Sequence, residues 1–219
     1  MQLFWEGLVC TVSLSALSVV AGFILALVLA TMRLAKFKPL RFVATTYVEL
    51  FRATPMMVQL FLIYHVALAG VSLPTFKLFG FIRFERFIPG VIALSLNSGA
   101  YLCEIVRSGI QSVDMGQTEA ARSLGLTAWQ NMRYIVLPQA MKNILPAIAN
   151  EFVTIIKESS IAWTIGVQDI MGAVNSVTAA TFSMAEPLIV ATCIYFCLTF
   201  PTSKVIQHFE RKMSRGDKR

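Results

Sequence analysis

Residues 7–32 read GLVCTVSLSALSVVAGFILALVLATM, a run of 26 residues without a charged side chain. An α-helix rises about 1.5 Å per residue, so ~20 apolar residues cross the ~30 Å hydrocarbon core of a bilayer. No Lys or Arg precedes the run, and it is longer than the apolar segment of a signal peptide. The run therefore predicts a membrane-spanning helix that is retained in the protein.

Further uncharged stretches follow along the chain, at Ala53–Phe76, Phe87–Cys103 and Pro187–Ser203. Overall, 56% of the residues are hydrophobic and 14% are charged, against about 25% charged in soluble domains. The stretches do not alternate polar and apolar residues as transmembrane β-strands do. We therefore expect an all-α integral membrane protein, and not a soluble, disordered or disulfide-stabilised chain.

Five membrane spans are expected within a single domain that covers residues 1–219. Their approximate limits are Leu8–Met32, from Phe51–Pro55 to before Pro74, Phe87–Val106, Ile144–Gly166 and Pro187–Gln207. Residues 107–143 form a cytoplasmic loop between the third and fourth spans.

The net charge of +7 is unevenly distributed along the chain. Cations gather in Arg33–Arg41, Arg107–Lys142 and Lys204–Arg219, which the positive-inside rule places in the cytoplasm. Val71–Arg86 and the stretch holding Asp169 and Glu186 then lie outside. The predicted topology has the N-terminus outside and the C-terminus in the cytoplasm. The basic character is thus a topology signal and not a nucleic-acid-binding surface.

Catalytic and metal-binding motifs are absent from the sequence. The four cysteines, Cys10, Cys103, Cys193 and Cys197, have no zinc-like spacing with a histidine. There is no P-loop, and neither His65 nor His208 has a catalytic partner in the sequence. We expect no metal and no cofactor in this chain, so energy must come from another polypeptide or from an ion gradient.

Polar residues are nevertheless spaced along two of the spans. Glu151, Thr154 and Glu158 share a face of the fourth span, and Asn97, Tyr101 and Glu104 follow helical spacing in the third. A charge at the centre of a membrane helix costs about 2.5–3.5 kcal/mol on insertion scales. These faces must therefore meet protein, water or each other, which suggests a dimer with a polar cavity between the subunits.

Each of these residues also has a structural interpretation. Glu151 can hold the ammonium group of an amino acid, or it can pair with Lys157 or with a cation of the second subunit. Asn97 and Tyr101 can bind substrate or join helices through hydrogen bonds. Glu104 can face the substrate or pair with Arg107 three residues on.

The cytoplasmic loop carries strong helix-boundary signals. Asp114–Gln117 and Thr127–Gln130 have the form of capping boxes, Gly125 fits a helix C-terminus, and Pro138 favours a new helical start. Ala120, Ala121 and Leu124 would form a small apolar patch on the first short helix. That patch can dock another protein or pack on the loop's own second helix.

The loop resembles the EAA motif of ABC-importer permeases. The matching residues are Glu119-Ala120-Ala121, Gly125 three residues later, and Ile135-Val-Leu137-Pro138 after nine more. Further matches to the polar amino-acid branch are Arg52-Ala-Thr-Pro55, Asn97-Ser98-Gly-Ala-Tyr101 through Glu104, Asn150-Glu-Phe and Lys157-Glu-Ser159. The resemblance covers essentially the whole chain.

This resemblance implies a type I importer permease of the bacterial cytoplasmic membrane that translocates a polar amino acid. Its partners would be a dimer of cytoplasmic ABC ATPases, a second permease subunit (identical or similar), an extracytoplasmic amino-acid-binding protein and the surrounding lipid. ATP would bind only to the ATPase, so the chain itself would not be an enzyme. The alternative is an ion-coupled secondary transporter in which Glu151 or Glu104 carries a proton.

Two sets of site residues follow from the residues and the resemblance together. The candidate substrate contacts are Glu151, Asn97, Tyr101, Ser98, Glu104 and Thr154. The residues expected to couple to the ATPase are Glu119, Ala120, Ala121, Leu124, Gly125, Leu137 and Pro138.

Overall fold

The computed structural model describes residues 1–214, and most of them are helical. In chain order the elements are α1 (Gln2–Leu34), α2 (Lys38–Ala53), α3 (Met56–Leu62), the π-helical turn η1 (Ile63–Ala67), β1 (Lys77–Leu78), β2 (Ile82–Arg83), α4 (Phe84–Gln111), α5 (Met115–Ser123), α6 (Ala128–Asn131), the π-helical turn η2 (Met132–Val136), α7 (Leu137–Glu158), the 3-10 helix η3 (Ser159–Ile165), α8 (Ile170–Thr181) and α9 (Ala185–Ser214). The predicted all-α class is confirmed, with one short antiparallel ladder in which Lys77 faces Arg83.

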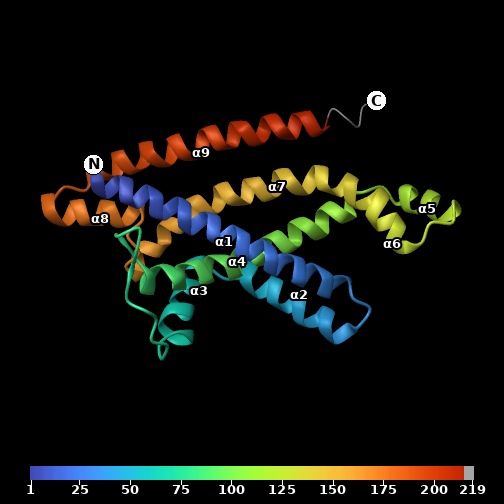
Figure 1. Ribbon diagram of the computed structural model, residues 1–219, viewed down its shortest axis with the longest axis horizontal. Coiled ribbons are helices and arrows are strands. Elements are labelled where there is room, and N and C mark those ends of the chain that lie inside the picture. Colours follow the sequence, from blue (N-terminus) through green and yellow to red (C-terminus); the bar gives the residue numbers. More distant parts are fainter. Residues whose placement is uncertain (215–219) are drawn as a thin grey trace.

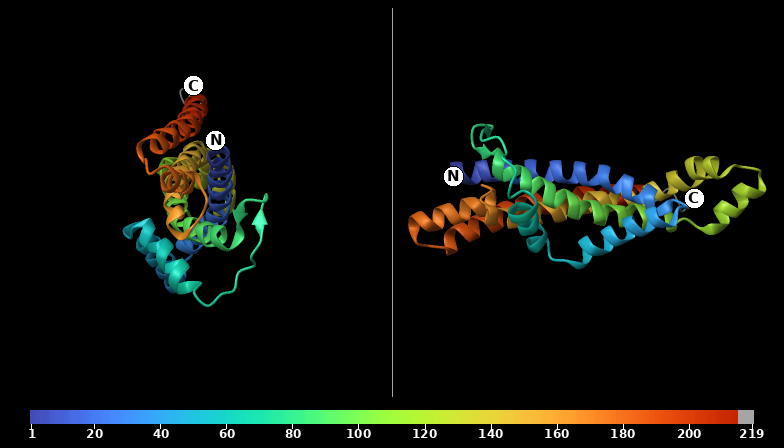
Figure 2. Two further views of the ribbon diagram at one scale, coloured as in Figure 1. Left: turned by 90° about the vertical axis from the view of Figure 1, so that its left-hand side faces the viewer. Right: turned by 90° about the horizontal axis from the view of Figure 1, so that it is seen from below.

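The molecule is elongated, and α1, α4, α7 and α9 extend along its length (Figure 1). The α5–α6 loop lies at one end, together with the turn after α1 and the C-terminal end of α9, whereas α8 lies at the other (Figures 1 and 2). The three segments predicted to be cytoplasmic are therefore gathered at the same end. Arg215, Lys218 and Arg219 of the last segment lie outside the described residues.

Four of the five expected spans have a helical counterpart that is long and apolar enough to cross a membrane. Three are continuous: α1, α4 and residues Ala185–Met213 of α9. The fourth is the pair Lys38–Ala53 and Met56–Ala67, which is bent by 112°. The expected span Ile144–Gly166 falls in α7 and η3, which do not meet this criterion. Its crossing of the membrane remains a prediction.

The second span differs from expectation because the chain is already helical from Lys38 and bends sharply after Ala53. Thr54 is extended, with φ −112° and ψ 144°, as is usual for a residue that precedes a proline. Pro55 also lacks the N–H group that a continuous helix would use. The proline therefore explains why the helix is interrupted at this point.

The centre of the bundle is α4. In its most apolar 18-residue stretch 61% of the residues are buried, whereas in the corresponding stretch of α9 only 11% are. α1 packs closely along α4, and Gly22 permits this approach. A Cβ atom at this position would lie only 3.1 Å from the Gly99 nitrogen and the Ser95 carbonyl oxygen of α4. Small residues at such crossings let helix backbones approach each other. α9 is largely unburied within the chain, so its surface can contact lipid or another subunit.

The stretch around Asp169, expected to be an outside loop, is instead partly helical and buried. Asp169 is fully buried and caps α8, its Oδ1 accepting from the Gly172 N–H group at 2.8 Å. Its Oδ2 has no hydrogen-bond partner among the described residues. Burial raises the pKa of the Asp169 carboxyl to about 7, against the lowering effect of the backbone hydrogen bond from Gly172.

Candidate functional site

Glu151 is a half-buried carboxylate on α7 without a counter-charge. The ion pairs of the described residues are Arg33–Glu104, Arg83–Glu85 and Arg107–Glu104. None of them includes Glu151, and Lys157 is exposed and does not pair with it. The pairing with Lys157 that the sequence allowed is thus not formed, and a substrate or a cation of a second subunit remains as the partner.

Ser98 lies on the neighbouring α4 and is fully buried. Its hydroxyl approaches the Glu151 carboxylate without forming a hydrogen bond of normal geometry, and it has no other partner among the described residues. An unpaired hydroxyl beside an unpaired carboxylate is unusual in a protein interior. The two groups together leave hydrogen-bonding capacity for a polar ligand.

Tyr101 follows Ser98 by one helical turn on α4 and is 37% exposed. The guanidinium carbon of Arg52, at the end of α2, lies 5.5 Å from the centre of the Tyr101 ring. This distance is typical of a cation–π contact. The packing of α2 on α4 therefore places a positive charge beside Tyr101, a contact of Arg52 that the sequence alone did not predict.

Asn97 performs the structural role that the sequence left open. It is buried, and its amide donates to Oε1 of Gln59 at 2.9 Å. The Gln59 amide in turn donates to the Phe51 carbonyl at 2.7 Å and to the Thr54 hydroxyl at 2.8 Å. This network holds the bend between α2 and α3 against α4. Gln59 was missed because a lone amide in an apolar run does not show its partner.

Glu104 is bound by two arginines from different helices. Arg33 of α1 donates to it at 2.7 Å, and Arg107 forms a short hydrogen-bonded ion pair with the same carboxylate. The pairing with Arg107 is the internal alternative stated above, and Arg33 is an addition to it. Thr154, also a candidate contact, donates to the carbonyl of Asn150 at 3.2 Å within its own helix.

The loop between α4 and α7, predicted to be cytoplasmic, folds into two short helices as its boundary signals predicted. The Thr127–Gln130 capping box is present in full. Asp114 caps α5 through the Gly116 N–H group, and not through the reciprocal bond expected with Gln117. Gly125 has φ +82°, and the hydrogen bond from Leu126 N–H to the Ala121 carbonyl, at 3.1 Å, completes a glycine C-cap.

The residues of the EAA motif divide between this loop's interior and its surface. Ala121 is buried, and the hydrogen bond from Asn131 to the Thr118 hydroxyl at 3.2 Å ties α5 to α6. Glu119, Ala120, Leu124, Gly125, Leu137 and Pro138 are all exposed. Since Asp114 provides the cap of α5, Glu119 is not needed for that purpose.

Large apolar side chains surround these exposed residues. Leu124 is 81% exposed, and Met115, Trp129 and Tyr134 are exposed as well. We call Met115, Leu124, Trp129 and Tyr134 the loop face. Exposed apolar groups on a protruding loop are typical of a protein-binding surface.

This arrangement is that of a helical membrane protein with an unpaired carboxylate on α7 and an exposed two-helix loop at one end. Comparison with known proteins identifies its class. Residues 18–215 match the family of binding-protein-dependent transport system inner membrane components. The chain belongs to this family, and it is the non-catalytic permease subunit of an ABC transport system. Membership implies an ATPase and a binding protein as partners, and a multi-pass position in the inner membrane.

Individual relatives lie in the polar amino-acid branch that the motifs indicated. The arginine transport system permease protein ArtQ of Bacillus subtilis is 41% identical over 97% of this chain and 93% of its own. The nopaline transport system permease protein NocM of Agrobacterium fabrum is 40% identical over 90% and 81%. A crystal structure of an amino acid ABC transporter with histidines is 43% identical, with a TM-score of 0.88 over 96% of this chain and 94% of that one. An ion-coupled secondary transporter, the alternative from the sequence, does not fit this family.

Proposed function

We propose that Glu151 binds the positively charged group of a polar amino acid as the substrate crosses the inner membrane. The observation that carries this proposal is a half-buried carboxylate without a counter-charge among the described residues. A carboxylate in a low-dielectric site binds an ammonium or guanidinium group through charge-assisted hydrogen bonds. The relatives named for arginine and nopaline transport support a substrate of this class.

Neighbouring groups would complete the contact. Ser98 can donate its hydroxyl hydrogen to the Glu151 carboxylate or to the ligand. Arg52 and Tyr101 offer a cation and a phenol to the substrate carboxylate, at the same polar face of α4. Thr154 lies on the same face of α7 as Glu151 and provides a further acceptor. Asn97 and Glu104 support this site by holding the helices, through the contacts described above.

A second permease subunit, identical or similar, would close the pathway. Glu151 is only half-buried and Tyr101 is exposed in the single chain, so their polar faces need a cover in the membrane. The same chain leaves α9 almost unburied, which gives lipid or a partner subunit a surface to contact. We place the end that bears the α5–α6 loop in the cytoplasm, with the N-terminus outside, because the basic segments gather there.

The loop face and Glu119 would contact a dimer of cytoplasmic ATPases, to which ATP binds. Closure of the ATPases on ATP would move the loop, and the helices that follow it would expose the polar pathway to one side and then to the other. The movement can be transmitted because α6, η2 and α7 follow one another without a break. The binding protein would deliver the amino acid on the opposite side.

Uptake by the reconstituted permease–ATPase complex tests the role of Glu151. In Glu151→Gln, uptake of radiolabelled L-arginine should fall roughly tenfold or more, because a charged hydrogen bond is lost. Uptake of L-glutamine should fall less. Glu49→Gln is the control, since Glu49 is an exposed carboxylate on α2. Equal kinetics of Glu151→Gln and wild type would assign Glu151 a structural role.

A further inference from the structure

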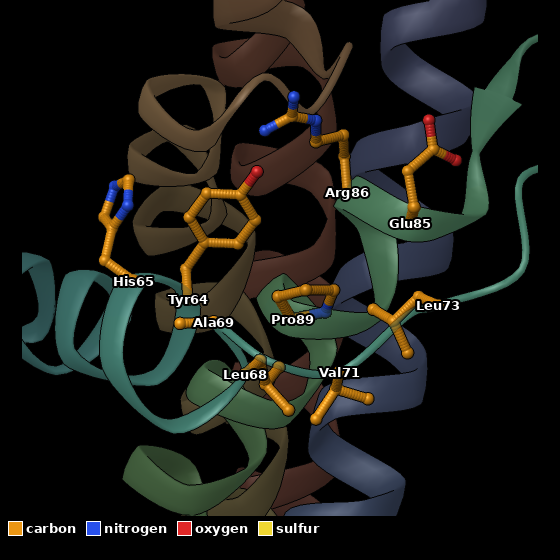
Figure 3. Close-up of a pocket in the computed structure, with 9 residues that line it drawn as sticks. All are labelled: Tyr64, His65, Leu68, Ala69, Val71, Leu73, Glu85, Arg86 and Pro89. Atoms are coloured by element: carbon orange, nitrogen blue, oxygen red, sulfur yellow. The ribbon is translucent and has the colours of Figure 1, made fainter.

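A cavity of about 420 Å³ lies between η1 and the first turns of α4 (Figure 3). These elements lie in the half of the molecule that bears α8, away from the α5–α6 loop (Figure 1). None of the residues assigned to the pathway or to ATPase coupling lines it. Its polar wall consists of Tyr64 and His65 from η1 and of Glu85 and Arg86 from α4. A volume of this size is within the range of about 300–1,000 Å³ that is usual for small-molecule sites.

Arg86 supplies a fixed and uncompensated positive charge to this cavity. Its Nη1 donates to the Ile165 carbonyl at 3.2 Å, and its guanidinium carbon lies 5.3 Å from the centre of the Tyr64 ring. No carboxylate of the described residues pairs with it, and its other N–H groups have no hydrogen-bond partner there. A half-buried guanidinium that is held in place but unpaired is suited to bind a carboxylate.

Acceptors for a positive group lie next to Arg86 in the sequence. Glu85 lines the same cavity, and its only ion pair among the described residues is a long one, 3.5 Å, with the exposed Arg83. Pro89 also lines the cavity, and because proline has no N–H, the Glu85 carbonyl lacks its usual helical donor. In Figure 3 the side chains of Glu85 and Arg86 extend from α4 above the ring of Pro89.

The aromatic wall comes from an irregular helix. Tyr64 and His65 lie in the π-helical turn Ile63–Ala67, a conformation often found at functional sites. In Figure 3 the Tyr64 hydroxyl points toward the Arg86 guanidinium. The remaining wall is apolar and includes Leu68 and Val71, which can contact an aliphatic side chain.

We propose that this cavity binds a free α-amino acid as a zwitterion, in addition to the pathway site at Glu151. The carboxylate would bind Arg86 and the Tyr64 hydroxyl, and the ammonium group would bind Glu85 and its free carbonyl. The site would hold substrate at the outer end of the permease before it enters the pathway. The identity of the ligand class rests on the proposed function, whereas the charge pattern of the cavity does not.

Equilibrium dialysis of the purified permease–ATPase complex, without binding protein, against radiolabelled L-arginine tests this site. Arg86→Gln should weaken one component of the binding about tenfold or more, since a charge-assisted pair is lost. Arg41→Gln, which changes an exposed arginine on α2 away from this cavity, should bind as the wild type does. Glu151→Gln should retain the Arg86-dependent component. Agmatine, which is arginine without its carboxylate, should fail to displace that component from the wild-type complex.

Equal binding by Arg86→Gln and Arg41→Gln would overturn the proposal, as would full displacement by agmatine. Repeating the measurement in phosphatidylcholine nanodiscs with and without phosphatidylethanolamine separates a lipid headgroup from a free amino acid. Arg86-dependent retention of phosphatidylethanolamine, with no L-arginine bound, would also overturn it. If the complex takes up amino acids while Arg86→Gln binds normally, only this inference fails. If it takes up none, the proposed function itself fails.

Discussion

Glu104 shows how a charge within a membrane helix can be stabilised by its own chain. Its carboxylate lies between Arg33 of α1 and Arg107 of α4, and the three side chains are 16–32% exposed. Two guanidinium groups surround one carboxylate, so the cluster carries a net positive charge. It joins α1 to α4 near the end of the bundle that bears the α5–α6 loop.

Removing this carboxylate should destabilise the fold measurably. We expect Glu104→Gln to lower the free energy of unfolding by about 1–3 kcal/mol, since two half-buried arginines would lose their counter-charge. Arg83→Gln breaks a more exposed pair, in which Arg83 is 58% exposed, and should change it by less than about 1 kcal/mol. Thermal unfolding in the same detergent compares the two. Equal thermal unfolding midpoints of Glu104→Gln and Arg83→Gln would show that the Glu104 cluster contributes no more to stability than the exposed pair does.

Among single residues, the sequence indicated those whose charge conflicts with an apolar span. Glu151 and Glu104 were candidates for that reason, although only the structure shows that one is unpaired and the other doubly paired. Gln59 and Arg52 could not be predicted. Their partners, Asn97 and Tyr101, are distant in the sequence, and only the packing of α2 and α3 on α4 brings them together.

Secondary-structure elements were predictable where local chemistry determines them. The glycine C-cap at Gly125 and the Thr127 capping box are set by residues within one turn. By contrast, α2 and α8 were not predicted. α2 carries several charges and was assigned to a basic loop, and α8 has only 12 residues. Both depend on packing against the bundle, which a local pattern does not contain.

The loop containing α5 and α6 should determine ATPase binding. Leu124→Asp should leave the fold and insertion intact, since Leu124 is 81% exposed. It should reduce the amount of ATPase that co-purifies by roughly tenfold, because a charge would replace an apolar contact in the loop face. Phe182→Asp, at the end of α8 and 95% exposed, is the control. Undiminished ATPase recovery with Leu124→Asp would contradict the docking role of this face.

The cap of α8 should make stability depend on pH. The Asp169 carboxyl has a pKa of about 7 in the folded protein, against ~3.9 in an unfolded chain. The folded state therefore binds this proton more tightly, so the stabilisation is fully present below about pH 4 and is lost as the pH rises to 7. The groups around it, Cys10, Thr11 and Tyr195, provide no cation to oppose this.

Asp169→Asn keeps an oxygen acceptor for the Gly172 N–H group and removes the titration. We expect the wild type to be less stable at pH 8 than at pH 5, by up to about 2.6 kcal/mol from this group alone. The variant should lose most of that difference. Thermal unfolding at both pH values measures it, and the same pH dependence in both proteins would show that Asp169 does not titrate in this range.

At the scale of the whole molecule, the distribution of charge along the chain predicted correctly which segments lie at the same end of the bundle. The positive segments predicted to lie on one side of the membrane do occupy one end of the bundle (Figure 1). Hydropathy does not give all five expected spans, because α7, the helix that carries Glu151, contains several charged residues and is not among the apolar candidate spans. Which helices form the centre could not be predicted, since α1 and α9 have similar apolar runs but very different burial.

The central claim is that this chain moves an amino acid only together with an ATPase. The most direct measurement is uptake of L-arginine into proteoliposomes that contain the permease with its co-purified ATPase and binding protein. We predict uptake that requires ATP and all three components and that persists when a protonophore is added. Uptake by the permease alone, driven by an ion gradient and abolished by the protonophore, would contradict the account.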